Sequence, residues 1–363
     1  MIPSTDITLI GGGIIGLLTA RAFVEAGASV TVIDKNRLGQ ESSWAGGGIL
    51  LPIYPWRQNA AITTLVRHSL SLYPSLAAEL KAATGIDPEW SPCGLLITQT
   101  PDSDAARVWC RNQGIVCQSD LPDTSCLQAQ MDKPLWLSEI AHIRNPRLLK
   151  ALRQDLVQKG VQLLECCTLN TLISENDVVV SISTSAGRQA VNQLIFTTGA
   201  WTGALCRQFL PHQASPEIKP VKGQMLLFDA EPNTLAFMVL EKDHYLIPRR
   251  DGKILAGSTL EDCDFDKTTS WSAYRRLKSF AENLCPALKD CTDIRHWAGL
   301  RPGTSRGIPY ITRHPAFNNL SINAGHFRNG LVMAPASAQL MVDLILNRPG
   351  VIAAESYQMT ARH

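Results

Sequence analysis

The first 34 residues contain two short apolar runs on either side of a helical pattern. Residues 7–10 are apolar except for Thr8, and residues 29–33 are rich in β-branched side chains and end just before Asp34. Residues 14–26, between the two runs, are mostly apolar and have helical character. This order predicts a strand, a helix and a second strand that together form one β-α-β unit.

Helical and strand patterns also occupy separate parts of the rest of the chain. Helices are predicted at residues 60–83, 146–159, 271–284 and 330–346. Strands are predicted at residues 93–98, 161–164, 178–182 and 191–198, and the last three lead back toward the sheet of the first unit. Short strands at residues 224–228, 245–248 and 253–257 favour a separate, mostly antiparallel sheet.

Composition places the chain among ordinary globular proteins. The 363 residues are 45% apolar and 18% charged, which excludes a disordered or fibrous chain. Lys and Arg number 34 against 32 Asp and Glu, so the net charge is only +2. Because this balance provides no long-range field to hold nucleic acid or an acidic membrane surface, we expect neither as a partner.

Cysteine spacing and the N-terminal sequence indicate the cellular compartment in which the protein is expected. The ten cysteines are scattered without a CxxC pair, which favours reduced, mostly buried thiols. The N-terminal apolar run follows no basic region and is interrupted by glycines, so we expect neither a signal peptide nor a membrane span. The chain has no HExxH motif and no Cys/His cluster at ligand spacing, so no metal is expected. These features predict a soluble, cytoplasmic protein.

Glycines gather where the first predicted strand ends. Gly11, Gly13 and Gly16 form a GxGxxG motif that opens the first helix. Gly11 allows a tight turn, Gly13 lets a pyrophosphate approach the backbone, and Gly16 permits close packing of helix on strand. Asp34, at the end of the second strand, is placed to accept hydrogen bonds from a ribose. The motif predicts a dinucleotide site, and nicotinamide and flavin cofactors both remain open at this point.

A second cluster of small residues favours the larger cofactor. Ser42, Ser43 and Ala45 lead into Gly46, Gly47 and Gly48, only a few residues beyond Asp34. A ligand that needs bare backbone at two places is extended, as a flavin dinucleotide is. A flexible loop is the alternative, but Trp44 and the apolar residues 49–51 are not typical of a loop tip.

The GGGIIG turn, Asp34 and the segments SSWAGGGIL and PIYPWR resemble the FAD-dependent amine oxidases of the D-amino-acid oxidase group, and within it the glycine oxidases of the thiamine-biosynthesis type. The resemblance covers nearly the whole chain and implies noncovalently bound FAD. The expected fold is α/β, with a discontinuous Rossmann-like FAD-binding domain at residues 1–85, 145–213 and 322–363. An inserted α+β substrate domain at residues 86–144 and 214–321 is expected to be built on a mostly antiparallel sheet.

Candidate substrate residues lie in the later part of the chain. Arg301, in an otherwise apolar GLRP segment, has no charged partner nearby in sequence, and such a guanidinium suits a carboxylate. The resemblance assigns Arg301 and Tyr245 to the carboxylate of an amino-acid substrate. It also puts Arg328 at the edge of the substrate cavity and Leu260 in the pocket lining. His326 is expected to be structural, because direct hydride transfer needs no base.

Most of the residues expected to contact FAD lie in the two glycine clusters, around residues 169–201 and in the segment that opens the last helix, and Asp34, Lys35 and Arg301 lie outside these regions. The full set is Gly11, Gly13, Ile14, Ile15, Gly16, Asp34, Lys35, Ser42, Ser43, Ala45, Gly46, Gly47, Gly48, Leu169, Thr198, Gly199, Trp201, Arg301, Gly325, Phe327, Arg328, Asn329, Gly330 and Leu331.

The activity that the resemblance implies is oxidative deamination of glycine and of other small amines or D-amino acids such as sarcosine. The imine product gives glyoxylate and ammonia, and O2 is reduced to H2O2. The resemblance also implies a role in forming the thiamine thiazole ring and a homo-oligomer, either a tetramer or a dimer. One alternative is a D-amino-acid or sarcosine oxidase or dehydrogenase. Another is an amine-oxidising tRNA-modification protein, against which the near-neutral charge argues.

Overall fold

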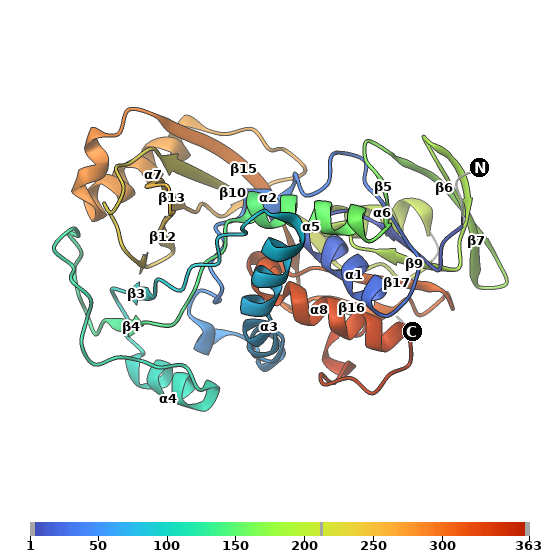
Figure 1. Cartoon of the computed structure of the whole chain (residues 1–363), viewed down its shortest axis with the longest axis horizontal. Coiled ribbons are helices and arrows are strands. Elements are labelled where there is room, and N and C mark those ends of the chain that lie inside the picture. The colour runs from blue at the N-terminus through green and yellow to red at the C-terminus, as the bar shows by residue number, and fades with distance from the viewer. Residues whose placement is uncertain (1–3, 211–212, 360–363) are drawn as a thin grey trace.

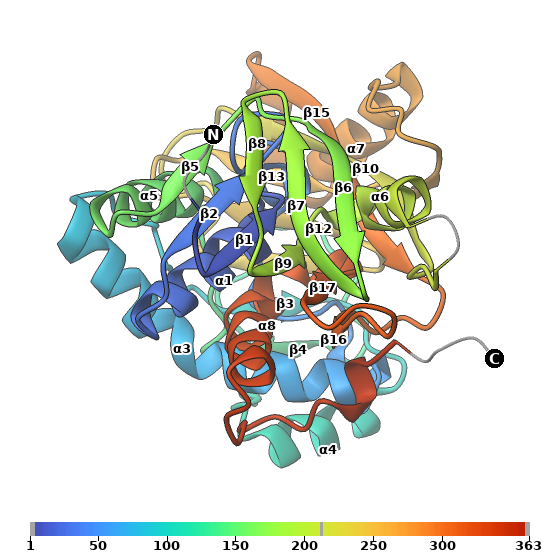
Figure 2. The same ribbon diagram turned by 90° about the vertical axis from the view of Figure 1, so that its right-hand side faces the viewer.

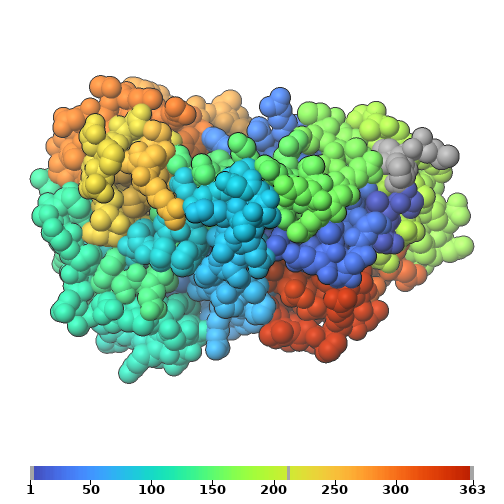
Figure 3. Space-filling view, in the orientation of Figure 1, coloured from blue at the N-terminus to red at the C-terminus, as the bar shows by residue number. Residues whose placement is uncertain are grey.

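The computed structural model describes residues 4–210 and 213–359, which form two units (Figure 1). The unit on the right of Figure 1 is built on a six-stranded sheet, and the unit on the left is built on an eight-stranded sheet. In the space-filling view, the light-blue chain around residues 60–84 runs between the two units on the face shown (Figure 3).

The six-stranded sheet has the order β16-β17-β9-β1-β2-β5 and collects strands from three distant parts of the chain. β1 pairs in parallel with both β2 and β9, and in the part of the sheet that is described only β16 runs antiparallel. The strands are β1 (Ile7–Ile10), β2 (Val30–Ile33), β5 (Gln162–Leu164), β9 (Gln193–Phe196), β16 (Tyr310–Arg313) and β17 (Leu320–Ala324).

Both faces of this sheet are buried. Four helices share one core with Leu9 and Val32: α1 (Ile14–Glu25), α3 (Ala60–Thr84), α5 (Asn145–Gln158) and α8 (Gly330–Ile345). The other core contains Ile10 and Phe196 and is covered by α6 (Thr202–Phe209) and a small antiparallel sheet, β6 (Leu169–Glu175), β7 (Val178–Thr184) and β8 (Gly187–Ala190). Figure 2 shows β6 to β8 in front of the central strands. Because neighbouring side chains on a strand point to opposite faces, these strands are mostly apolar on both faces rather than alternating apolar and polar.

The eight-stranded sheet has the order β14-β10-β13-β12-β11-β3-β4, and β15 pairs with β10. All of its pairs are antiparallel except that of β11 with β3. The strands are β3 (Leu95–Ile97), β4 (Leu135–Leu137), β10 (Ile218–Phe228), β11 (Met238–Glu241), β12 (His244–Pro248), β13 (Ile254–Gly257), β14 (Glu261–Asp262) and β15 (Ile294–Thr304). Two helices pack beside it, α4 (Ser103–Gln113) and α7 (Trp271–Leu284), whereas the short α2 (Ser42–Ala45) lies in the glycine-rich segment.

The predicted elements are confirmed at most positions, and α3 and α7 match within one residue. Two predictions were wrong. The strand predicted at residues 178–182 does not join the main sheet, because β7 pairs with β6 and β8 in a layer above it. The third cofactor-domain segment was expected to begin at residue 322, but it includes all of β16, because Tyr310 pairs with Ala324 in the six-stranded sheet.

The remaining domain boundaries stay a prediction. Residues 1–3, 211–212 and 360–363, which fall at the ends of the predicted cofactor-domain segments, lie outside the described residues. Within residues 4–210 and 213–359, none of the helices has the length and apolar character needed to cross a membrane.

Candidate functional site

A cavity of about 450 Å³ is lined by residues from both units. Twenty-two of the 24 predicted cofactor residues line it, and so does Tyr245. The remaining two, Gly16 and Gly325, lie outside the lining. A Cβ at Gly16 would meet the carbonyl oxygen of Gly11, which agrees with its predicted role in helix packing, and a Cβ at Gly325 would meet Thr304. The structure therefore brings together segments from both ends of the chain.

The first glycine turn forms one end of the cavity. Gly11 has a φ of +108°, and a Cβ on it would lie 2.6 Å from the carbonyl oxygen of Thr197, so only glycine fits there. The Asp34 carboxylate accepts hydrogen bonds from the N–H groups of Gly12 at 2.7 Å and Asn36 at 2.8 Å. Burial nevertheless raises the pKa of Asp34 above its usual value. The Ile14 N–H donates to the Ser43 hydroxyl at 2.9 Å. The remaining free N–H groups of the first turn of α1 are available to an anion.

Hydrogen bonds from distant parts of the chain hold the second glycine cluster in place. The Trp297 ring N–H donates to the Ala45 carbonyl at 3.1 Å, and the Ile143 N–H donates to the Gly48 carbonyl at 2.9 Å. The Asn145 side-chain amide donates to the Ser43 carbonyl at 2.7 Å. With its carbonyls engaged elsewhere, this segment presents bare backbone to the cavity.

Trp201 lies in the wall on the side of η2 (Gly199–Trp201). The Lys35 ammonium lies 4.1 Å from its ring centroid, and the Phe265 ring stacks with it at 5.5 Å between centroids. Phe265 belongs to the loop between β14 and α7, and Lys267 in the same loop forms an ion pair with Glu41 at 3.0 Å. This loop, which follows a strand of the eight-stranded sheet, therefore reaches across to the unit with the six-stranded sheet.

The last segment of the cavity wall opens α8. The turn η4 (Phe327–Asn329) leads directly into the helix, and both contribute lining residues. The neighbouring His326 ring forms a hydrogen bond with the Ser337 hydroxyl at 2.9 Å. Burial lowers the pKa of His326 to about 3, so the ring is neutral at ordinary pH. The start of α8 offers N–H groups and a positive dipole end to the cavity.

Arg301 and Tyr245 meet at the end formed by the eight-stranded sheet. The Arg301 guanidinium donates to the Thr259 carbonyl at 3.1 Å and to the Ser258 hydroxyl at 2.8 Å. Burial lowers the pKa of Arg301 from its ordinary value, and Tyr245 partly offsets this effect. The Tyr245 hydroxyl donates to the Met225 sulfur at 3.5 Å, which is a weak acceptor.

Arg301 and Arg328, the two arginines that line the cavity, have no acidic partner in the described part of the chain. No ion pair within the described residues includes Arg301 or Arg328, although both line the cavity. The guanidinium of Arg301 is bonded only to neutral oxygens. Its charge is therefore available to an anionic ligand.

Leu260 does not line the cavity, which corrects the prediction from resemblance. Its side chain is 57% exposed, whereas the preceding Ser258 and Thr259 are buried and provide the oxygens that hold Arg301. Sequence reasoning missed Met225 and Ser258 at this end, as well as Gly223, Gly299 and Pro302. Asn145 was also missed, and its only signal in the sequence is a position just before Pro146 at the start of a predicted helix.

Comparisons with known proteins agree with this geometry. Residues 6–344 match the family model described as FAD dependent oxidoreductase. The chain is 40% identical to a glycine oxidase of Pseudomonas aeruginosa, over 99% of this chain and 100% of that protein. It is 31% identical to a bifunctional protein ThiO/ThiG of a Nostoc species, over 94% of this chain and 53% of that protein. Among solved structures, a glycine oxidase from Geobacillus kaustophilus matches with a TM-score of 0.90 at 25% identity, over 99% of both chains.

Proposed function

The chain belongs to the family of FAD-dependent oxidoreductases, and from this we propose that it oxidises glycine. The reaction removes two electrons and two protons from glycine and leaves an imine. Water then converts the imine to glyoxylate and ammonia, and O2 takes up the electrons and becomes H2O2. The observation that carries the proposal is the unpaired Arg301 guanidinium beside the Tyr245 hydroxyl in the cavity wall.

The cavity suits FAD. The side-chain oxygens of Asn145 and Asn323 are buried without a hydrogen-bond partner among the described residues, and both residues line the cavity. A buried polar atom without a partner is costly, so a polar ligand is expected there. Gly11 leaves no room for a side chain, as expected where backbone approaches a ligand. When bound, FAD accepts a hydride from the substrate carbon and delivers the electrons to O2.

In this proposal, three groups hold the substrate. Arg301 binds the carboxylate of glycine through charge-assisted hydrogen bonds, and the Tyr245 hydroxyl leaves the Met225 sulfur to donate to the same carboxylate. Arg328 adds positive charge at the edge of the cavity. Fixing the carboxylate orients the carbon that loses the hydride, so much of the catalysis is positioning.

The chain needs no base on the substrate carbon in this reaction. His326 is the nearest candidate in sequence to the flavin-contacting segment, but its ring is neutral, buried and bonded to Ser337. We assign it a structural role at the start of α8.

The biological setting is proposed as well. The likeness to the bifunctional protein ThiO/ThiG supports a role in forming the thiazole ring of thiamine, where an imine of glycine is the useful product. The cytoplasmic location and the assembly into a tetramer or dimer stay predictions.

Anaerobic mixing tests the proposal. Glycine should bleach the visible absorbance of the bound flavin, and on admission of air the colour should return as peroxide forms. Sarcosine, D-alanine and D-proline form the comparison panel. Flavin that is bleached by one of these and not by glycine would contradict the glycine assignment. Bleaching without peroxide on reoxidation would point to a dehydrogenase.

A further inference from the structure

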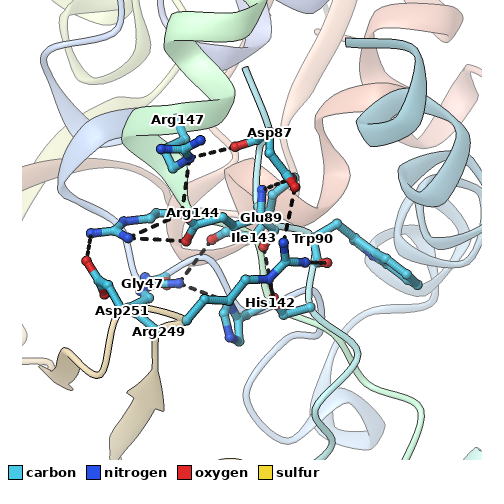
Figure 4. Close-up of polar contacts among 12 residues, drawn as sticks. Gly47, Asp87, Glu89, Trp90, His142, Ile143, Arg144, Arg147, Arg249 and Asp251 are labelled. Carbon is cyan, nitrogen blue, oxygen red and sulfur yellow. Dashed lines mark hydrogen bonds and ion pairs between the residues drawn. The ribbon is translucent and has the colours of Figure 1, made fainter. Parts of the chain in front are cut away.

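Arg249 is a buried cation just outside the cavity lining. It follows β12, the strand that carries Tyr245, and only 8% of it is exposed. Its guanidinium donates to the Gly47 carbonyl at 2.7 Å and to the Ile143 carbonyl at 3.2 Å (Figure 4). Burying a charge among neutral acceptors costs free energy, so this arrangement calls for an explanation.

Arg249 also lacks an acidic partner among the described residues. The carboxylates around it are taken by other arginines, since Arg144 pairs with Glu89 and Asp251, and Arg147 pairs with Glu89 (Figure 4). The remaining neighbour of Arg249 is the Nδ1 atom of His142, at 3.0 Å. Burial and the charge of Arg249 hold the pKa of His142 well below its usual value, so His142 is neutral and accepts the hydrogen bond.

The contact with Gly47 determines how the second glycine cluster is presented. The carbonyl of Gly47 and the N–H of Gly48 belong to one peptide group and point in opposite directions. Arg249 holds that carbonyl away from the cavity, so the Gly48 N–H is directed to the opposite side. Among the described residues, nothing accepts a hydrogen bond from this N–H. Gly48 has a φ of +89°, a conformation that glycine adopts without strain.

We propose that Arg249 is a positioning residue for FAD, which acts through the Gly47 carbonyl to aim the Gly48 N–H at the cavity. Three other groups also hold carbonyls of the cluster: Trp297 holds Ala45, the Asn145 amide holds Ser43, and the backbone of Ile143 holds Gly48. Of these four anchors in the described part of the chain, Arg249 alone is charged. It also links the strand of Tyr245 to the cofactor segment, so the two parts of the site are held in one arrangement.

Arg250 provides a matched control. It is the next residue in the chain and donates to the Ser91 hydroxyl at 3.0 Å and the Trp90 carbonyl at 2.6 Å. It also pairs with Asp87 at 3.2 Å. Arg250 thus belongs to the same polar cluster and contacts no residue of the cavity lining.

The test measures the rate of FAD release from the holoenzyme, followed as the rise in flavin fluorescence after dilution. Arg249→Met leaves the Gly47 and Ile143 carbonyls without their donor, and we expect release to accelerate about 10- to 100-fold. Arg249→Lys should fall between the parent and Arg249→Met, because one ammonium cannot reproduce the planar fork. Arg250→Met should release FAD within about twofold of the parent rate, since surface substitutions rarely act at a distance.

Two results would overturn the proposal. One is release from Arg249→Met at the parent rate, and the other is equal acceleration in Arg250→Met. If Arg249→Met does not fold, Arg249→Lys decides, and release from that variant at the parent rate contradicts the proposal. The readout needs no turnover, so it stands even if glycine proves not to be the substrate. Steady-state kinetics at saturating FAD complete the test. Under these conditions the kcat of Arg249→Met for glycine should come closer to the parent value than its rate of FAD release does.

Discussion

The two ends of the cavity use different parts of the polypeptide. At the cofactor end, the groups that face the cavity are mostly backbone, presented by Gly11, Gly13 and the cluster around Gly47. At the substrate end they are side chains, with Arg301 on β15 and Tyr245 on β12 of the eight-stranded sheet. A long anionic cofactor can be bound through many N–H groups, whereas a small substrate requires a few strong, well-placed charges.

Glycine serves both ends, in different ways. Gly11 lets the strand-to-helix turn pack against the backbone of Thr197, as its positive φ and the lack of space for a Cβ show, and this turn lines the cavity. Gly223, on β10, instead leaves room for a side chain, because a Cβ there would occupy the place of the Arg301 guanidinium. The comparison therefore predicts that substitutions at the two ends fail differently: cofactor-end variants should lose FAD, and substrate-end variants should keep FAD and bind glycine poorly.

Gly11→Ala should have the largest effect. The new Cβ would lie 2.6 Å from the Thr197 carbonyl oxygen, and the change should weaken FAD binding more than about 100-fold, so that the protein is isolated without colour. The ratio of flavin to protein absorbance measures this. Gly27→Ala is the matched control, because Gly27 also has a positive φ, +90°, but nothing lies within 4 Å of an added Cβ. Full flavin content in Gly11→Ala would contradict the interpretation that the cofactor end of the cavity binds FAD through its backbone.

Arg301→Met should have the largest effect among substitutions at the substrate end. Loss of the charged anchor for the carboxylate should raise the KM for glycine about 100-fold or more, while the flavin content stays that of the parent. Steady-state kinetics and absorbance together separate the two effects. Arg295→Met, on the exposed part of the same strand, should change neither. A parent-like KM in Arg301→Met would remove the carboxylate assignment.

This contrast also explains what the sequence could predict. The cofactor end was found because its glycines lie close together between a strand and a helix, where local spacing carries the information. The substrate end combines residues that are distant in sequence, such as Met225, Ser258 and Arg301, and their proximity follows from the pairing of β10 with β13 and β15. Leu260 shows the limit of prediction from the sequence. Only the path of the chain after Ser258 decides which side chains face the cavity.

His326 is a buried side chain at the cofactor end of the cavity. Its lowered pKa predicts that the free energy of unfolding falls as the pH falls. Burial lowers that pKa from 6.5 to about 3, so the unfolded chain takes up the proton first as the pH falls. Stability from this group is complete above pH 6.5 and is lost progressively toward pH 3, with about 2 kcal/mol lost between pH 7 and 5. Urea unfolding at several pH values measures it.

His326→Gln removes that titration, so its unfolding free energy should fall less between pH 7 and 5 than that of the parent protein. His68→Gln, on α3, is the control and should keep the slope of the parent curve. A parent-like slope in His326→Gln would show that other groups cause the acid sensitivity.

Tyr245→Phe should give the smallest effect, and for that reason it is the finest test of the comparison. The substitution removes one neutral hydroxyl from a carboxylate that Arg301 still holds, and one such hydrogen bond contributes about 0.5–1.5 kcal/mol. The KM for glycine should therefore rise about 2- to 10-fold, with flavin content unchanged. Tyr274→Phe, the same change on α7 beside Trp271, should leave KM at the parent value. If Tyr245→Phe raised the KM for glycine as much as Arg301→Met does, the hydroxyl would have a role beyond holding the carboxylate. Charge alone would then not account for how the substrate end binds glycine.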